Sequence, residues 1–239
     1  MEPTYLDLAK MIDHSLLQPF LSVDELEAGL ELAVAYECAS VCILPHYLQR
    51  AAQRLEGTGV KASTTIGFPH GGHRTDVKVY EAQRALADGA EELDMVVNVS
   101  LVKSGRWDEV KHDIRAVVDL AHAAKQKVKV IFENAYLTDD EKVRLCEVCN
   151  AVGADWAKTS TGYAPSGATI EDLQLMVSHC KAPVQVKAAG GVRDLATLRQ
   201  VRGLGVTRVG MSKTADVLDA WRVQLGLDPI GMRAAPGGY

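Results

Sequence analysis

The sequence predicts a single (β/α)8 TIM barrel, because strand-like and helix-like segments alternate regularly along it. From Ser40 to Gly210, short apolar, β-branched runs are each followed by a longer segment with helical spacing, and no linker-like tract interrupts them. The 239 residues are close to the ~250 of such a barrel, and no GxGxxG turn marks a nucleotide-binding open sheet. The expected strands lie at 11–16, 40–44, 60–66, 92–97, 127–133, 154–158, 184–187 and 206–210.

The expected helices begin at residues whose side chains can cap a helix. Ser22 precedes Val-Asp-Glu, Thr138 precedes Asp-Asp-Glu, and Asp194 follows strand seven. The side-chain oxygens of Ser, Thr and Asp accept hydrogen bonds from the free N–H groups of a first helical turn. We therefore expect one continuous domain over 1–239, in which 226–239 forms a flexible tail.

Composition and charge narrow the class of protein. The content of 47% hydrophobic and 24% charged residues is that of an ordinary globular domain, and the net charge of −5 gives no attraction to nucleic acid or anionic membranes. Charged residues near the N-terminus exclude a secretory leader, and no apolar run approaches the ~18 residues of a membrane span. We expect a cytoplasmic protein, with neither nucleic acid nor membrane as a partner, that forms a homo-oligomer.

Alternation along the strands places charged side chains inside the barrel. Successive side chains of a strand point to opposite faces, so apolar residues packed against helices leave their neighbours inside. Val184 and Val186 suit the helix layer, which leaves Lys187 inside, and Lys158 shares the face of Trp156. The other residues assigned to the interior are Glu92, Asp94, Val96, Lys129, Ile131, Glu133 and Gln185.

Two lysines and a carboxylate fall late in their strands, where barrels of this class carry active sites. A deprotonated lysine amine attacks a carbonyl and forms an iminium, which acts as an electron sink for carbon–carbon cleavage. We assign Lys158 as this nucleophile. Repulsion by Lys187, aided by burial, would tune the pKa of Lys158 toward ~7 to 8. Asp94 is the candidate general acid/base; the alternative is that all three only form buried ion pairs.

Glycine-rich turns after the last two strands predict an anion site. Gly190 and Gly191 follow strand seven, whereas Gly210 and Ser212 lie where strand eight gives way to a helix. Free backbone N–H groups, the helix dipole and a hydroxyl suit a phosphate, although these glycines could also only form turns. Further candidate substrate contacts are Thr159, Thr161, Asp13 and Cys42, and packing is an equal alternative for Asp13 and Cys42.

Metal ligation is only weakly suggested. His70 and His73 have a possible ligand spacing, but they lie in a glycine-rich loop without a nearby carboxylate or cysteine. Cys146 and Cys149 form a CxxC within an amphipathic helix pattern, and no second pair completes a site. We therefore expect no metal and no other cofactor.

Six segments of the chain resemble, in the same order, those of the deoxyribose-phosphate aldolase family of class I aldolases. The resemblance extends from about residue 5 to 225. The matching segments are IDHSLL at 12–17, VCILP at 41–45, IGFPHG at 66–71, ELDMVVN at 92–98, AKTSTG at 157–162 and VKAAGGVR at 186–193.

The resemblance implies reversible cleavage of 2-deoxy-D-ribose 5-phosphate into acetaldehyde and D-glyceraldehyde 3-phosphate, without metal or organic cofactor. It assigns the Schiff base to Lys158, its activation to Lys187 and proton transfer to Asp94. It also places Asp13 and Cys42 in the pocket and Gly190, Gly191, Gly210 and Ser212 at the phosphate. Because some family members end in a mobile tyrosine tail that assists protonation, it suggests Tyr239 as a proton relay.

Two segments depart from the family pattern, and two rival functions remain open. Met211 and Lys213 flank Ser212 where a small Gly/Ser-rich run is usual, and Tyr163 stands where some relatives carry a basic residue. One rival is a metal-dependent aldolase or sugar-phosphate epimerase that uses His70, His73 and a carboxylate. The other is a sugar-phosphate-binding barrel without catalysis.

Overall fold

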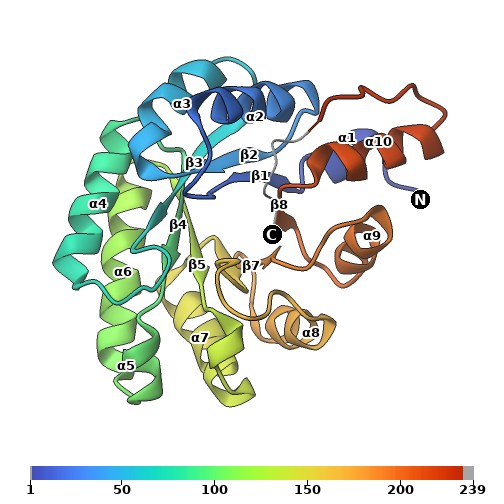
Figure 1. Cartoon of the computed structure of the whole chain (residues 1–239). Coiled ribbons are helices and arrows are strands. Elements are labelled where there is room, and N and C mark those ends of the chain that lie inside the picture. The colour runs from blue at the N-terminus through green and yellow to red at the C-terminus, as the bar shows by residue number, and fades with distance from the viewer. Residues whose placement is uncertain (1, 234–239) are drawn as a thin grey trace.

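Eight parallel strands close into a barrel in the computed structural model, which describes residues 2–233 (Figure 1). Each strand pairs with the next one along the chain, and β8 pairs with β1, so the barrel has the expected topology. The strands are β1 (Ile12–Leu16), β2 (Ser40–Ile43), β3 (Lys61–Ile66), β4 (Glu92–Val96), β5 (Lys127–Ile131), β6 (Trp156–Lys158), β7 (Gln185–Ala189) and β8 (Arg208–Met211).

Helices surround the barrel, and many begin at a capping side chain (Figure 1). Ser22, Thr138 and Asp194 are confirmed as N-caps, and the first two form capping boxes with the third residue of their helices. The helices are α1 (Tyr5–Ala9), α2 (Val23–Ala35), α3 (Leu48–Leu55), α4 (Thr75–Ala87), α5 (Val99–Lys103), α6 (Trp107–Ala123), α7 (Asp139–Val152), α8 (Ile170–His179), α9 (Leu195–Gly203) and α10 (Thr214–Gln224), with short 3-10 turns η1 (Pro45–Tyr47) and η2 (Asn134–Tyr136).

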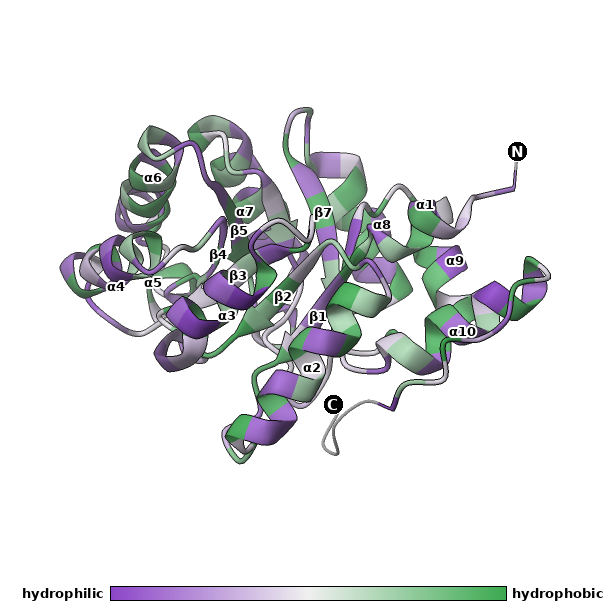
Figure 2. Ribbon diagram, turned by 90° about the horizontal axis from the view of Figure 1, so that it is seen from above, coloured by the Kyte–Doolittle hydropathy of each residue, from purple (hydrophilic) through white to green (hydrophobic). Residues whose placement is uncertain are grey.

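The apolar core lies mainly between the strands and the helices. Figure 2 shows hydrophobic and hydrophilic residues alternating along helices such as α2 and α10, as expected of helices with one face against a sheet. Outward-facing strand residues such as Leu93, Val128 and Val186 are buried in this layer. The barrel interior is different, because charged side chains occupy much of it.

The ends of some expected strands differ from the structure by a few residues. β6 begins at Trp156 instead of residue 154, and β7 continues to Ala189. β5 ends at Ile131, before Glu133, because Glu133 has left-handed backbone angles (φ 60°, ψ 63°) that cannot continue a strand. Glu133 therefore lies in the loop above the barrel.

The segment that follows α10 is attached to that helix over its described part. The N–H groups of Ile230 and Gly231 donate to the Asp219 carboxylate, and Ile230 and Met232 pack against the core. The remainder of the expected tail, with Tyr239, lies outside the described residues. No described helix is both long enough and apolar enough to cross a membrane.

Candidate active site

Asp94, at the centre of β4, joins the two predicted lysines. Its Oδ2 accepts hydrogen bonds from Lys158 Nζ at 2.7 Å and from Lys187 Nζ at 2.8 Å. All three side chains are buried inside the barrel, as the strand alternation predicted for Asp94 and Lys187. We call Asp94, Lys158 and Lys187 the carboxyl-end cluster, because Lys158 is the last residue of β6.

Lys158 has the property that a nucleophilic amine requires. Burial is the main cause that lowers its pKa, and the charge of Lys187 acts in the same direction, whereas Asp94 opposes both. The expected lowering is confirmed in direction, but desolvation and not like-charge repulsion is its largest cause. A lower pKa means that more of the amine is neutral at a given pH.

Lys187 contacts the same carboxylate oxygen, but its pKa shifts in the opposite direction. Burial alone would lower the pKa of Lys187, but Asp13 and Asp94 outweigh burial and raise it. Asp13 Oδ2 lies 2.5 Å from Lys187 Nζ and supplies a second negative charge that Lys158 lacks. Lys187 therefore remains a cation beside the amine of Lys158.

Asp94 is held as an anion by the cations around it. Burial alone would raise its pKa, but Lys129, Lys158 and Lys187 together hold the pKa well below the usual range. Lys129 Nζ donates to Asp94 Oδ1 at 2.9 Å, so both carboxylate oxygens contact ammonium groups. In this state Asp94 accepts hydrogen bonds and does not itself carry a proton.

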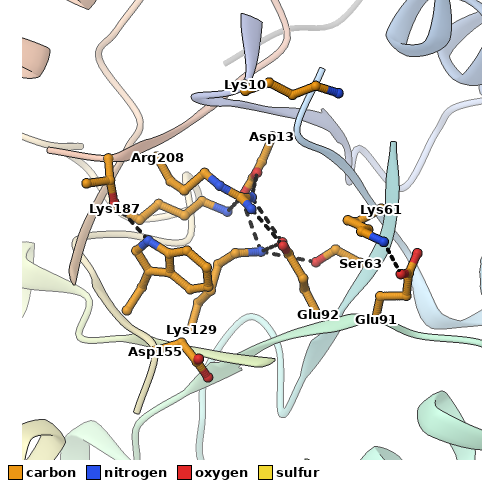
Figure 3. A network of polar contacts seen from close by, with 12 residues as sticks. Lys10, Asp13, Lys61, Ser63, Glu91, Glu92, Lys129, Asp155, Lys187 and Arg208 are labelled. Atoms are coloured by element: carbon orange, nitrogen blue, oxygen red, sulfur yellow. Dashed lines mark hydrogen bonds and ion pairs between the residues drawn. The ribbon is translucent and has the colours of Figure 1, made fainter. Parts of the chain in front are cut away.

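A second set of charges lies toward the amino ends of the strands (Figure 3). Arg208 forms a bidentate pair with Glu92, at 2.8 and 3.1 Å, and also donates to Asp13. Lys129 Nζ lies 2.5 Å from Glu92 and 3.2 Å from Asp13, and the Trp156 ring lies against both cations. We call Asp13, Glu92, Lys129 and Arg208 the amino-end cluster.

Two of the candidate pocket residues face this interior. Asp13 is fully buried, and its described contacts are with Lys129, Lys187 and Arg208. Burial raises the pKa of the Cys42 thiol to about 11, and the group also interacts with Asp94 and Lys158. Cys42 therefore faces the carboxyl-end cluster as a neutral thiol.

The hydroxyl groups of the turn after Lys158 make backbone and side-chain contacts of their own. Thr159 Oγ1 donates to the carbonyl of Ala189 and accepts from its N–H group, which joins the end of β6 to β7. Thr161 Oγ1 donates to Glu133. Ser160 Oγ is buried without a hydrogen-bond partner among the described residues. Thr159 and Thr161 therefore both donate their hydroxyl protons within the protein.

The glycines after β7 are required by backbone geometry. Gly190 and Gly191 have φ angles of +71° and +100°, and a Cβ atom at Gly190 would lie 3.0 Å from the Cα of Gly167. The N–H of Ala168 donates to the carbonyl oxygens of Ala189 and Gly190 at 3.1 and 2.8 Å. The loop after β6 thus packs directly on the turn after β7.

Gly210 and Ser212 lie at the other predicted anion-binding turn. A Cβ atom at Gly210 would lie 3.4 Å from Cε of Lys187, so this glycine lies in van der Waals reach of the lysine side chain. Ser212 lies between β8 and α10, and Lys213 is the N-cap of α10 without a capping side-chain hydrogen bond. The first N–H groups of α10 therefore lack a side-chain acceptor at the cap, which is the arrangement that suits an anion.

The two candidate metal-binding histidines lie at different places on the surface. His70 lines a cavity of about 230 Å³ with Glu133 and Tyr163, whereas His73 lines another cavity with His112 and Asp113. Within residues 2–233, no group of three His, Cys, Asp or Glu residues is arranged to hold a metal ion. This donor set does not favour the metal-dependent rival.

Sequence reasoning did not foresee several features of the site. Alternation placed Lys129 inside but gave it no role, and Arg208 received no assignment. Glu133 was expected within β5, whereas its carboxylate instead binds the turn after Lys158. The inward parity of residues 92 and 129 was the available signal for an ion-pair network.

Comparison with known proteins identifies the family. The family model described as "DeoC/LacD family aldolase" matches residues 8–204. The chain belongs to this family of aldolases. A deoxyribose-phosphate aldolase from Rhodopirellula baltica is 60% identical over 230 residues, which cover 96% of this chain and 95% of the relative. One from Staphylococcus epidermidis is 43% identical over 88% of this chain and 94% of the relative.

A solved structure agrees with this assignment. The structure described as the unique tetramer of deoxyribose phosphate aldolase from Aeropyrum pernix has a TM-score of 0.85 and 31% identity, and covers 92% of this chain and 93% of that chain. The expected family and barrel fold are both confirmed. The chain is an aldolase, and therefore a lyase.

Proposed function

We propose that this aldolase cleaves 2-deoxy-D-ribose 5-phosphate reversibly to acetaldehyde and D-glyceraldehyde 3-phosphate, through a Schiff base on Lys158. The observation that carries the proposal is a buried lysine with a lowered pKa next to a lysine that stays cationic, both on one carboxylate oxygen. The names of the relatives support the substrate.

The proposed reaction begins with attack of the neutral Lys158 amine on the aldehyde carbon of the open-chain sugar. The carbinolamine loses water and becomes an iminium, which draws electrons from the C2–C3 bond as the C3 hydroxyl loses its proton. Glyceraldehyde 3-phosphate leaves, and an enamine remains on Lys158. Protonation of its terminal carbon and hydrolysis then release acetaldehyde and restore the amine.

The other two members of the carboxyl-end cluster have different proposed roles. The charge of Lys187 favours the neutral form of Lys158. Lys187 is also the proposed proton donor, because both amines contact the same oxygen of Asp94. Asp94 keeps Lys187 protonated and passes a proton from it, through a bound water, to the carbinolamine oxygen or the enamine carbon. Because its pKa is low, Asp94 is ionised at rest and only relays this proton.

The phosphate is proposed to bind at the turns after β7 and β8. Gly190 and Gly191 form the turn after β7 with positive φ angles, and Ser212 and the start of α10, which lacks a capping side chain, follow β8. Lys213 is exposed there and lies 3.7 Å from Asp216. The sugar chain would then extend from this site toward Lys158.

Borohydride trapping tests the mechanism. Incubation with acetaldehyde and sodium borohydride should add one reduced two-carbon group, and peptide mass mapping should place it on Lys158. Lys158→Met should form no adduct and lose at least about 10³-fold in kcat/KM. An enzyme that is active, resists trapping and loses activity with chelator would overturn the proposal and favour the metal-dependent rival.

We also propose an oligomeric state, a cellular location and the small-molecule partners of the site. The tetramer of the relative from Aeropyrum pernix supports a homo-oligomer, and we propose a cytoplasmic location for an enzyme that acts on small phosphorylated metabolites. The partners proposed for the site are this sugar phosphate and its aldehyde products. A barrel that only binds sugar phosphate would leave the lowered pKa of Lys158 without a purpose.

A further inference from the structure

Glu133 has an unusual backbone conformation at the carboxyl end of the barrel. Among the described residues other than glycine, positive φ angles occur at Glu37, Lys125 and Glu133. Glu37 and Lys125 are exposed and follow the ends of α2 and α6, where left-handed residues commonly terminate helices. Glu133 instead follows a strand and is only 4% exposed. Such a conformation costs about 1–2 kcal/mol and persists where surrounding contacts enforce it.

The contacts that hold Glu133 lie on the segment after Lys158. Glu133 Oε1 accepts a hydrogen bond from the Thr161 N–H at 3.2 Å, and Oε2 accepts one from the Thr161 hydroxyl. Thr161 Oγ1 in turn accepts from the Tyr163 N–H at 3.0 Å. The only hydroxyl proton of Thr161 is thus directed at Glu133, which fixes the orientation of this side chain.

The same segment is attached at each end. Thr159 is bound to Ala189 of β7, and the Tyr163 hydroxyl donates to the Leu17 carbonyl at 2.7 Å. The Tyr163 ring meets Phe68 edge-on, with centroids 5.5 Å apart. Glu133 supplies the attachment in the middle, through Thr161. Loss of that attachment would leave five residues next to Lys158 tied only at their ends.

We propose that Glu133 is a positioning residue for Lys158, which anchors the segment 159–163 through Thr161 only while its carboxylate is ionised. The proposal rests on the Schiff-base role of Lys158 proposed above. An ionised carboxylate is a stronger acceptor than a neutral carboxylic acid or amide, and two bonds to one residue fix both its backbone and its side chain. The strained backbone at Glu133 aims the carboxylate at that residue.

The environment of Glu133 makes this anchor sensitive to acid. Burial raises the pKa of Glu133, while the hydrogen bonds from Thr161 and the charges of Lys158 and His70 oppose that rise. His70 faces it from the β3–α4 loop, Lys158 from β6, Tyr136 from η2 and Tyr163 from the loop after β6; β4 contributes only apolar side chains to the shared cavity. Protonation would remove an acceptor from Thr161 and loosen the segment.

Hydrogen exchange followed by mass spectrometry tests the anchor without any substrate. In Glu133→Gln, which keeps the side-chain shape, exchange in the peptide covering 159–163 should accelerate about tenfold, because charged hydrogen bonds are stronger than neutral ones. Glu37→Gln makes the same substitution in the same backbone conformation at an exposed site and should leave this peptide unchanged. Equal exchange in Glu133→Gln and the unmodified protein would refute the anchor.

The pH dependence separates ionisation from general packing. After correction for intrinsic exchange, the peptide of the unmodified protein should open as the pH falls through the raised pKa of Glu133, and that of Glu133→Gln should show no such step. Thr161→Val should exchange fast at all pH values, whereas Thr161→Ser, which restores the hydroxyl, should exchange as slowly as the unmodified protein. A step that persists in Glu133→Gln would arise from a group other than Glu133 and contradict the proposal.

The rate of borohydride-trapped adduct formation tests the consequence for Lys158. Below the unfolding temperature of every variant, Glu133→Gln and Thr161→Val should each slow the reaction about 10- to 100-fold with a smaller change in the acetaldehyde concentration for half-saturation. The double variant should be no slower than the slower single one, since both act through one contact. Multiplicative losses would overturn the coupling. An unmodified protein that forms no adduct would refute the proposed mechanism, and the exchange data would still decide whether the anchor exists.

Discussion

The two charge clusters of the barrel interior contain similar side chains, but the pKa of Lys158 shifts in the opposite direction from those of Lys129 and Arg208. In the amino-end cluster, Arg208 and Lys129 face the carboxylates of Asp13 and Glu92, and these contacts outweigh burial and raise the pKa of both cations. In the carboxyl-end cluster, Lys158 shares a single carboxylate with two other lysines, and burial lowers its pKa. The balance of carboxylates to cations around each amine thus decides which one can react.

Disruption of the amino-end cluster gives the largest expected effect. Arg208→Met would remove a buried cation that pairs with both Glu92 and Asp13 and would leave these carboxylates to Lys129 and Lys187. It should lower the free energy of unfolding by about 3–5 kcal/mol in urea titrations. Lys127→Met removes an exposed cation that, like Arg208, lies over the Trp156 ring. This control should change the free energy of unfolding by at most about 0.5 kcal/mol.

The pH profile of adduct formation in the same variant shows whether the clusters are separate. Arg208→Met should trap acetaldehyde on Lys158 with nearly the same pH dependence as the unmodified protein, because Arg208 acts on Lys158 only indirectly, through Asp13 and Lys187. A clearly shifted profile would mean that the two clusters titrate as one unit. It would contradict the separate roles assigned to them.

The next effect is loss of stability in acid. The pKa values of Asp13 and Asp94 are lower in the folded protein than the ~3.9 of an unfolded chain, because of the surrounding cations. Their contribution to stability is therefore present above pH ~4 and is lost as the pH falls through the folded values. Urea midpoints should fall continuously below pH 4, and less steeply in Asp13→Asn. Asp24→Asn, at an exposed position, should follow the unmodified protein; a slope unaltered by Asp13→Asn would contradict the assignment.

The smallest effect is a displacement of the pH profile within the carboxyl-end cluster. Lys187→Leu removes a cation that lowers the pKa of Lys158 and leaves Asp94 Oδ2 to Lys158 alone. Both changes raise the pKa of Lys158, so adduct formation should require a pH about one unit higher. Lys181→Leu, which removes an exposed lysine in the loop before β7, should leave the profile unchanged. An unaltered profile in Lys187→Leu would show that burial alone sets the pKa.

Strand alternation carried most of the prediction of the site. The period of two residues is local, so the inward positions of Asp94, Lys129, Lys158 and Lys187 follow from the apolar residues beside them. Their mutual contacts depend on closure of the sheet, which brings β4, β5, β6 and β7 around one interior. The sequence order could indicate that these residues share an interior, but not that Lys158 and Lys187 meet at one oxygen.

Other features depend on contacts that no local pattern encodes. Arg208 is the first residue of β8 and reaches Glu92, the first residue of β4, across the barrel. Glu133 was expected in a strand because a left-handed backbone at a residue other than glycine arises from tertiary contacts, here with Thr161.

Gly210 borders the side chain of Lys187, whose charge acts on the amine of Lys158. The Cε of Lys187 passes over a position where any side chain would touch it, and its ammonium is held by Asp13 on one side and Asp94 on the other. Gly210, Asp13 and Asp94 together surround the end of the flexible Lys187 side chain. Two buried anions therefore fix the position of the Lys187 charge beside Lys158.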